Sequence, residues 1–187
     1  MTDGTALREI AAEILTEILE KGQYTHLALF QALSKYQYLE KSDRSFLKRI
    51  VDGTVEYKIQ IDYIINAYSK TKVHKMKQFI RTLLRMSVYQ IYYMDRVPDS
   101  AACNEAVRLA KKRGFSGLSG FVNGVLRSVA RGKDKLTFPD DSVRYSMPDW
   151  ILSLWKENYG AETTHRMAQA GLEKRPLMVR FAESRAG

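Results

Sequence analysis

Several features that would point to particular protein classes are scarce or missing in this sequence. Cys103 is the only cysteine, which excludes an internal disulfide and a cysteine-based zinc site and fits a reducing cytoplasm. No apolar run approaches the roughly 18 residues that a membrane helix needs, and the polar N-terminus shows no secretory signal. We therefore expect a cytoplasmic protein with no membrane partner.

Residues that commonly build catalytic or metal sites are equally sparse. His26, His74 and His165 are scattered, and none has the four-residue spacing to another ligand type that would suggest zinc. Cys103 lies near the start of a predicted helix, within a stripe that faces the core, and free cysteine is among the most buried residue types. We interpret it as a packing residue rather than a catalytic nucleophile.

The residues that are present suit a folded helical domain. The chain has 187 residues, 45% hydrophobic and 27% charged, which is enough for a core and argues against disorder. Apolar residues recur at helical spacing within residues 7–19, 29–36, 46–65, 79–92, 102–110 and 121–129. Strand alternation is absent before residue 175, so the main domain is predicted to be all-α. Gly53 interrupts the long third stripe and predicts a close helix crossing.

Positive charge is concentrated in the middle of the chain. Residues 41–135 hold 20 Lys and Arg against eight Asp and Glu, whereas residues 1–40 are net negative and residues 136–187 are balanced. This clustering favours a polyanion such as nucleic acid as partner, although solubility alone also explains a basic surface. The first candidate group is Lys70, Lys72, Lys75, Lys77, Arg81 and Arg85. The second is Arg108, Lys111, Lys112, Arg113, Arg127 and Arg131.

A short motif and its continuation carry a family resemblance. Asn104-Glu105-Ala106-Val107, followed by Gly120-Phe121-Val122-Asn123-Gly124-Val125-Leu126-Arg127, resembles the C-terminal signature of the NusB family. The same module is similar to the N-terminal domain of Sun/RsmB-type ribosomal RNA cytosine-5 methyltransferases. The resemblance implies an all-helical, NusB-like bundle that binds RNA through its basic residues.

The C-terminal part distinguishes between these two relatives. Met147-Pro148-Asp149-Trp150-Ile151, then Trp155, Tyr159-Gly160 and Arg175-Pro176-Leu177-Met178-Val179-Arg180-Phe181, resembles the connection into the methyltransferase body. It implies a NusB-like RNA-binding domain over residues 1–135. Residues 136–187 would be a short helical linker and the truncated beginning of an α/β methyltransferase body, with a strand near residues 175–181.

The resemblance also implies partners and cofactors. Ribosomal RNA would be the ligand, and S-adenosylmethionine would serve the parent protein, with its nucleophile in the missing region. We expect no cofactor in this fragment, because Gly114, Gly117, Gly120 and Gly124 lie between predicted helices rather than after a strand. The missing methyltransferase domain is an expected partner, and the C-terminal tail is a possible dimer contact.

Two other functions fit the same sequence. One is a NusB-type transcription antitermination factor that binds RNA and a ribosomal protein. The other is a helical protein-docking module whose partner is an acidic protein. The tail carries one further expectation. We expect the apolar stripe Trp150, Ile151, Leu154, Trp155 and Tyr159 to be covered in part by the bundle.

Overall fold

The computed structural model describes residues 4–173, and these form helices and connecting loops without a strand. The main helices are α1 (Gly4–Lys21), α2 (Thr25–Lys35), α3 (Lys41–Glu56), α4 (Lys58–Tyr68), α5 (Gln78–Tyr93), α6 (Asp99–Lys112), α7 (Ser119–Gly132), α8 (Asp141–Arg144) and α9 (Asp149–Leu172). Short 3-10 turns join them: η1 (Val73–Lys75), η2 (Ser116–Leu118) and η3 (Lys133–Lys135). The prediction of an all-α main domain is confirmed for the described residues.

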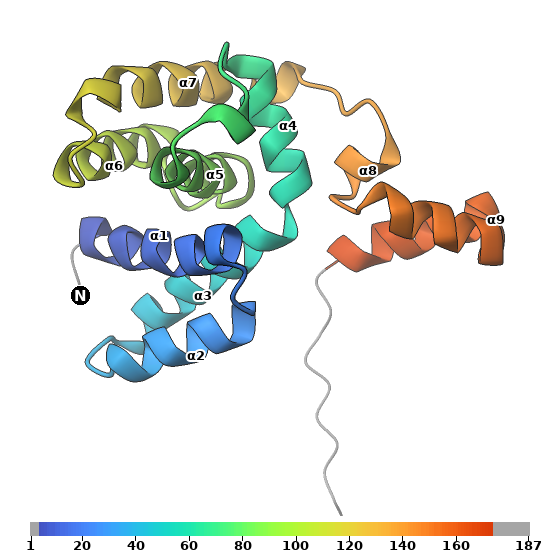
Figure 1. Cartoon of the computed structure of the whole chain (residues 1–187), viewed down its shortest axis with the longest axis horizontal. Coiled ribbons are helices and arrows are strands. Elements are labelled where there is room, and N and C mark those ends of the chain that lie inside the picture. The colour runs from blue at the N-terminus through green and yellow to red at the C-terminus, as the bar shows by residue number, and fades with distance from the viewer. Residues whose placement is uncertain (1–3, 174–187) are drawn as a thin grey trace, which may run out of the picture.

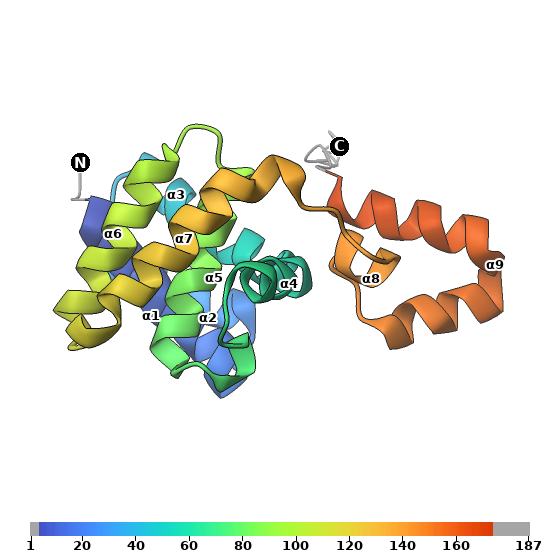
Figure 2. The ribbon, with the colours of Figure 1, turned by 90° about the horizontal axis from the view of Figure 1, so that it is seen from above.

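Helix α5 is the centre of the bundle (Figure 1; Figure 2). It packs against α1, α3, α4, α6 and α7. Its predicted stripe is buried as expected, and Leu83, Leu84 and Val88 have no exposed surface. A helix that is surrounded on most sides is buried on most sides. For this reason α5 also buries the polar side chains of Thr82, Ser87 and Gln90. The whole bundle is therefore organised around this one helix.

The close helix crossing predicted at Gly53 lies between α3 and α5. A Cβ atom built at Gly53 would overlap the ring of Tyr89, which lies directly against the α3 backbone. The long third stripe, in contrast, is not one helix, because it breaks at Tyr57 into α3 and α4. Helix α3 packs on α1 and α5, whereas α4 packs on α5 and α7, and a single straight helix cannot follow both directions.

This crossing gives a direct test of the fold. We expect Gly53→Ala to lower the free energy of unfolding by about 2 kcal/mol, because the added methyl group must displace the packed ring of Tyr89. Gly124→Ala is the matched control, since a Cβ there meets no atom within 4 Å. It should raise stability by roughly 0.5–1 kcal/mol through helix propensity alone. Urea unfolding measures the free energy of unfolding of both variants. Equal changes for Gly53→Ala and Gly124→Ala would contradict the close crossing of α3 and α5.

The C-terminal helices form a hairpin beside the bundle (Figure 2). Asp140 caps α8 by accepting a hydrogen bond from the Val143 backbone N–H at 2.8 Å. Gln60 of α4 anchors α8 by donating to the carbonyl oxygens of Val143 and Arg144. Helix α9 bends at Gly160, whose φ of 77° is in the region that favours glycine. Its second half therefore folds back along the first (Figure 2).

The apolar stripe of the first half of α9 is covered only in part. Trp150, Leu154 and Tyr159 are 68%, 49% and 57% exposed, whereas Ile151 and Trp155 are half-buried. The reason is that α9 packs on α8, which separates its first half from the bundle. The strand predicted near residues 175–181 lies outside the described residues. None of the described helices is long and apolar enough to cross a membrane.

Candidate nucleic-acid interface

The start of α5 lies beside the end of α6, and this brings members of both predicted basic groups together. The two helices are joined by the short turn at residues 94–98, so they run in opposite directions. Phe79 in the first turn of α5 stacks on Phe115 after α6, with ring centroids 5.6 Å apart and planes 12° from parallel. We call this region the basic end. The name also covers the lysines of the loop that leads into α5, so the basic end comprises Lys70, Lys72, Lys75, Lys77, Lys111, Lys112, Arg113 and the two phenylalanines.

The two stacked rings order the cations on either side of them. The Lys77 ammonium lies over the Phe115 ring at 5.7 Å, and the Arg113 guanidinium lies over the Phe79 ring at 5.7 Å. Cations are attracted to the negative face of an aromatic ring. The result is a surface ladder of cation, ring, ring and cation that spans α5 and the end of α6. Spacing in the sequence could not reveal it, because its halves are far apart along the chain.

The basic residues of this end differ in whether a carboxylate already neutralises them. Lys112 and Arg113 pair with Glu9 of α1, and Arg113 also pairs with Glu13. The Lys112 hydrogen bond is the main reason that the pKa of Glu9 is lowered, so this carboxylate stays charged. The exposed lysines of this end that form no ion pair with any described residue are Lys70, Lys72, Lys75, Lys77 and Lys111.

Arg81 and Arg85 are placed differently from the lysines that precede them. Arg85 binds both carboxylate oxygens of Asp62, at 2.7 and 2.9 Å, and lies 3.2 Å from Glu20. Arg81 donates to Glu20 at 2.7 Å, and this hydrogen bond is the main reason that the pKa of Arg81 is raised. The side chains of Glu20 and Arg85 are only 2% and 7% exposed. These two arginines therefore join α1, α4 and α5 instead of facing solvent with the lysines.

The remaining predicted cations lie away from the basic end. Arg108 pairs with Glu105 at 3.2 Å and donates to Thr5 at 3.0 Å. Arg127 and Arg131 are at the far end of α7, where they line a pocket of about 220 Å³ beside Cys103. The structure thus divides the second predicted group between two ends of the bundle. An α-helix of this length separates its first and last turns by about 20 Å.

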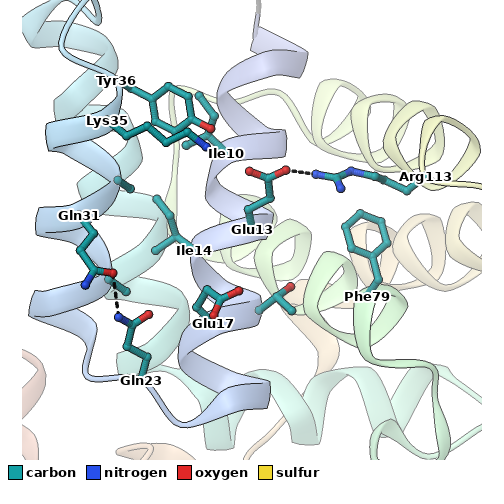
Figure 3. A pocket seen from close by; sticks show the side chains of 13 residues that line it. Ile10, Glu13, Ile14, Glu17, Gln23, Gln31, Lys35, Tyr36, Phe79 and Arg113 are labelled. Carbon is teal, nitrogen blue, oxygen red and sulfur yellow. Dashed lines mark hydrogen bonds and ion pairs between the residues drawn. The ribbon is translucent and has the colours of Figure 1, made fainter.

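A groove of about 480 Å³ opens beside the basic end, between α1 and α2 (Figure 3). Its apolar lining comes from Ile10, Ile14, Ala28 and Ala32, and Phe79 and Arg113 form the side shared with the basic end. Figure 3 shows Arg113 reaching Glu13 across one edge and Gln23 bonded to Gln31 at the other, with a distance of 2.9 Å. Sequence periodicity did not predict this groove, because it assigned these apolar residues to the core.

Cys103 is buried, as predicted, with 3% of its surface exposed. Burial raises the pKa of its thiol, and the nearby Arg127 offsets only part of this effect. A thiol held in its protonated form is a poor nucleophile. The described residues also lack a group of side chains able to hold a metal ion. A strand–turn–helix element of the kind that holds S-adenosylmethionine does not occur among them either.

The chain is similar to two kinds of curated protein. A probable ribosomal RNA small subunit methyltransferase B of Bacillus subtilis (strain 168) is 36% identical over 174 residues, covering 90% of this chain and 38% of that protein. The transcription antitermination protein NusB of Symbiobacterium thermophilum is 35% identical over 144 residues, covering 73% of this chain and 94% of that protein. The chain thus spans well under half the length of the methyltransferase relative.

Solved structures share the fold at low sequence identity. T. maritima NusB has a TM-score of 0.64 at 22% identity, covering 70% of this chain and 92% of its own. NusB in its complex with NusE and double-stranded RNA has a TM-score of 0.63 at 21% identity, covering 68% and 96%. PH0851 has a TM-score of 0.71 at 15% identity and covers 94% of this chain and 40% of its own. Residues 5–131 match the NusB family itself, and the chain therefore belongs to the NusB family.

Proposed function

We propose that this chain is an RNA-binding domain that positions ribosomal RNA for cytosine-5 methylation by the catalytic region of a longer protein. The observation that carries the RNA part is the basic end. Five of its lysines are exposed and form no ion pair with any described residue, and one of these, Lys77, lies over the ring of Phe115 in the stacked aromatic pair. Phosphate groups attract such lysines because neutralisation releases counterions. The two stacked rings hold the cations of Lys77 and Arg113 in place beside the other lysines.

The methylation part of the proposal rests on similarity in sequence. The methyltransferase B relative aligns with 90% of this chain, including residues beyond the 5–131 match to the NusB family. We propose that S-adenosylmethionine and the nucleophile belong to the region outside this chain, and that the α8–α9 hairpin leads into it. The exposed residues Trp150, Leu154 and Tyr159 offer that region an apolar contact surface.

A second candidate function is that of a NusB-type antitermination factor. It is favoured by the relative from Symbiobacterium thermophilum, of which this chain covers 94%. The alignment covers 73% of this chain, against 90% for the methyltransferase relative. The longer alignment supports the methyltransferase function. Both candidates use RNA as ligand, so the basic end has the same role in either.

RNA binding is tested most directly by its salt dependence. We expect the chain to bind a structured ribosomal RNA fragment with a slope of log affinity against log salt of roughly −4, because five unpaired lysines reach the phosphates at up to about −0.9 each. Fluorescence anisotropy with a labelled RNA hairpin measures it. A polyglutamate peptide serves as the control polyanion. Equal affinity for that peptide would favour the protein-docking function, and a flat slope would contradict phosphate binding.

A further inference from the structure

A second cleft lies at the opposite end of α5 from the basic end. Its volume is about 580 Å³, and it is bounded by the end of α3, the end of α5 and the end of α9. We call it the tyrosine cleft. Four tyrosines line it: Tyr57, Tyr89, Tyr92 and Tyr93. Four carboxylates also line it, Asp52, Glu56, Asp95 and Glu173, against the single basic side chain of Arg49.

The tyrosines form a fixed aromatic wall. Tyr57 stacks on Tyr93 with centroids 4.2 Å apart, and Tyr89 lies 5.4 Å from Tyr93. The Tyr93 hydroxyl donates to Gln60, and the ring of Tyr89 is held against Gly53. Burial raises the pKa of Tyr93, and it raises the pKa of Tyr92 to about 12. The wall therefore presents neutral rings and hydroxyl groups at physiological pH.

The charges around this wall leave an excess of negative charge. The Arg49 guanidinium donates a hydrogen bond to the carbonyl oxygen of Tyr93 at 2.9 Å. Lys48, outside the cleft, forms an ion pair with Asp52. Glu56 forms no ion pair with any side chain that the structure describes. Its pKa is raised, first by burial and then by repulsion from Asp52. A carboxylate in this position gains from an approaching cation.

We propose that the tyrosine cleft binds an arginine side chain of a basic polypeptide segment. A guanidinium group is planar, so it stacks on tyrosine faces while its N–H groups reach a carboxylate such as Glu56. The same negative charge repels a phosphate backbone, which separates this cleft from the basic end. The cleft would thus give the domain a protein-binding site in addition to its RNA surface, and the site does not depend on the proposed RNA function.

The test uses the full 187-residue chain and a short glycine–serine peptide that carries two adjacent arginines. The control peptide carries citrulline instead, which keeps the planar shape without the charge. We expect saturable binding by calorimetry and at least a tenfold weaker affinity for the citrulline peptide, since charge supplies the cation–π and carboxylate attraction. On addition of the arginine peptide, the largest changes in NMR chemical shift should occur at Tyr57 and residues 89–93. Equal affinity for both peptides would overturn the proposal.

Two variants and a competitor locate the site. Glu56→Gln removes one charge from the surface of the cleft and should weaken peptide binding at least threefold, whereas Glu157→Gln on the exposed face of α9 should leave it unchanged. Tyr57→Leu, checked for folding by circular dichroism, should weaken it similarly. An RNA hairpin should not displace the peptide. Displacement by RNA, or equal binding by Glu56→Gln, would overturn the assignment, while RNA affinity measured separately reports on the proposed function.

Discussion

Reversing four lysines of the basic end is expected to weaken RNA binding by at least about 100-fold. The variant changes Lys72, Lys75, Lys77 and Lys111 to glutamate, which replaces attraction to phosphate by repulsion and removes four sites of counterion release. The slope of log affinity against log salt should become flatter by roughly 3. A 100-fold loss corresponds to about 2.7 kcal/mol of binding free energy. Anisotropy titrations at several salt concentrations measure both quantities.

The matched control changes the same net charge elsewhere on the molecule. Lys41, Arg96, Lys156 and Arg166 are exposed and form no ion pair with another described residue. Reversing these four should alter RNA affinity by less than about fivefold, because distant charges are screened beyond about 10 Å at moderate salt. If the control variant loses as much affinity as the first, total charge rather than the basic end governs binding.

Removing the buried Glu20 side chain is expected to destabilise the bundle by about 3 kcal/mol. Glu20→Ala leaves Arg81 and Arg85 without the carboxylate that they share, and a buried ion pair that loses one partner typically costs about 3–5 kcal/mol. Asp62 still binds Arg85, so the lower part of this range applies. Urea unfolding monitored by circular dichroism gives the change in free energy of unfolding.

Glu17→Ala is the control for this prediction. Glu17 lies one turn before Glu20 on the same helix, but its pair with Lys21 is exposed on both sides. Its removal should cost less than about 0.5 kcal/mol. Should the Glu20→Ala variant be too unstable to purify, Glu20→Gln keeps the shape and loses only the charge. A loss for Glu20→Gln no greater than that for Glu17→Ala would show that the cluster contributes little to stability.

The sequence predicted the helices well where their apolar stripes are long. In α7 the buried residues follow the expected spacing, because core packing requires the period that the pattern shows. In α5 most predicted apolar positions are buried as well, but so are polar residues such as Thr82 and Arg85. Gly53 was also interpreted correctly, since glycine within a helix has few reasons to be there other than a close contact. The break at Tyr57 was missed. Its cause is the packing of two helix faces in different directions, and no turn residue marks it.

The candidate site was predictable only in part. Lys75 and Lys77 are exposed as their charge implies, but Arg85 has the same charge and is buried. The difference comes from Glu20 and Asp62, which stand far away in the sequence and meet Arg85 only in the folded bundle. The stacking of Phe79 on Phe115 and the assembly of the tyrosine cleft are contacts of the same kind. A single sequence shows residue types and periods, but not such distant pairs.

The central place of α5 has a consequence for synthesis of the chain. Helices α1 to α4 precede it and carry much of the core, including Ile14, Ile50 and Ile64, yet α5 supplies the surface on which α1, α3 and α4 pack. At about 5–20 residues per second, those helices emerge several seconds before α5 is complete. During that interval the nascent chain carries apolar faces that lack one of their packing partners. Helices α1 to α4 can therefore complete their packing only after the ribosome has synthesised α5.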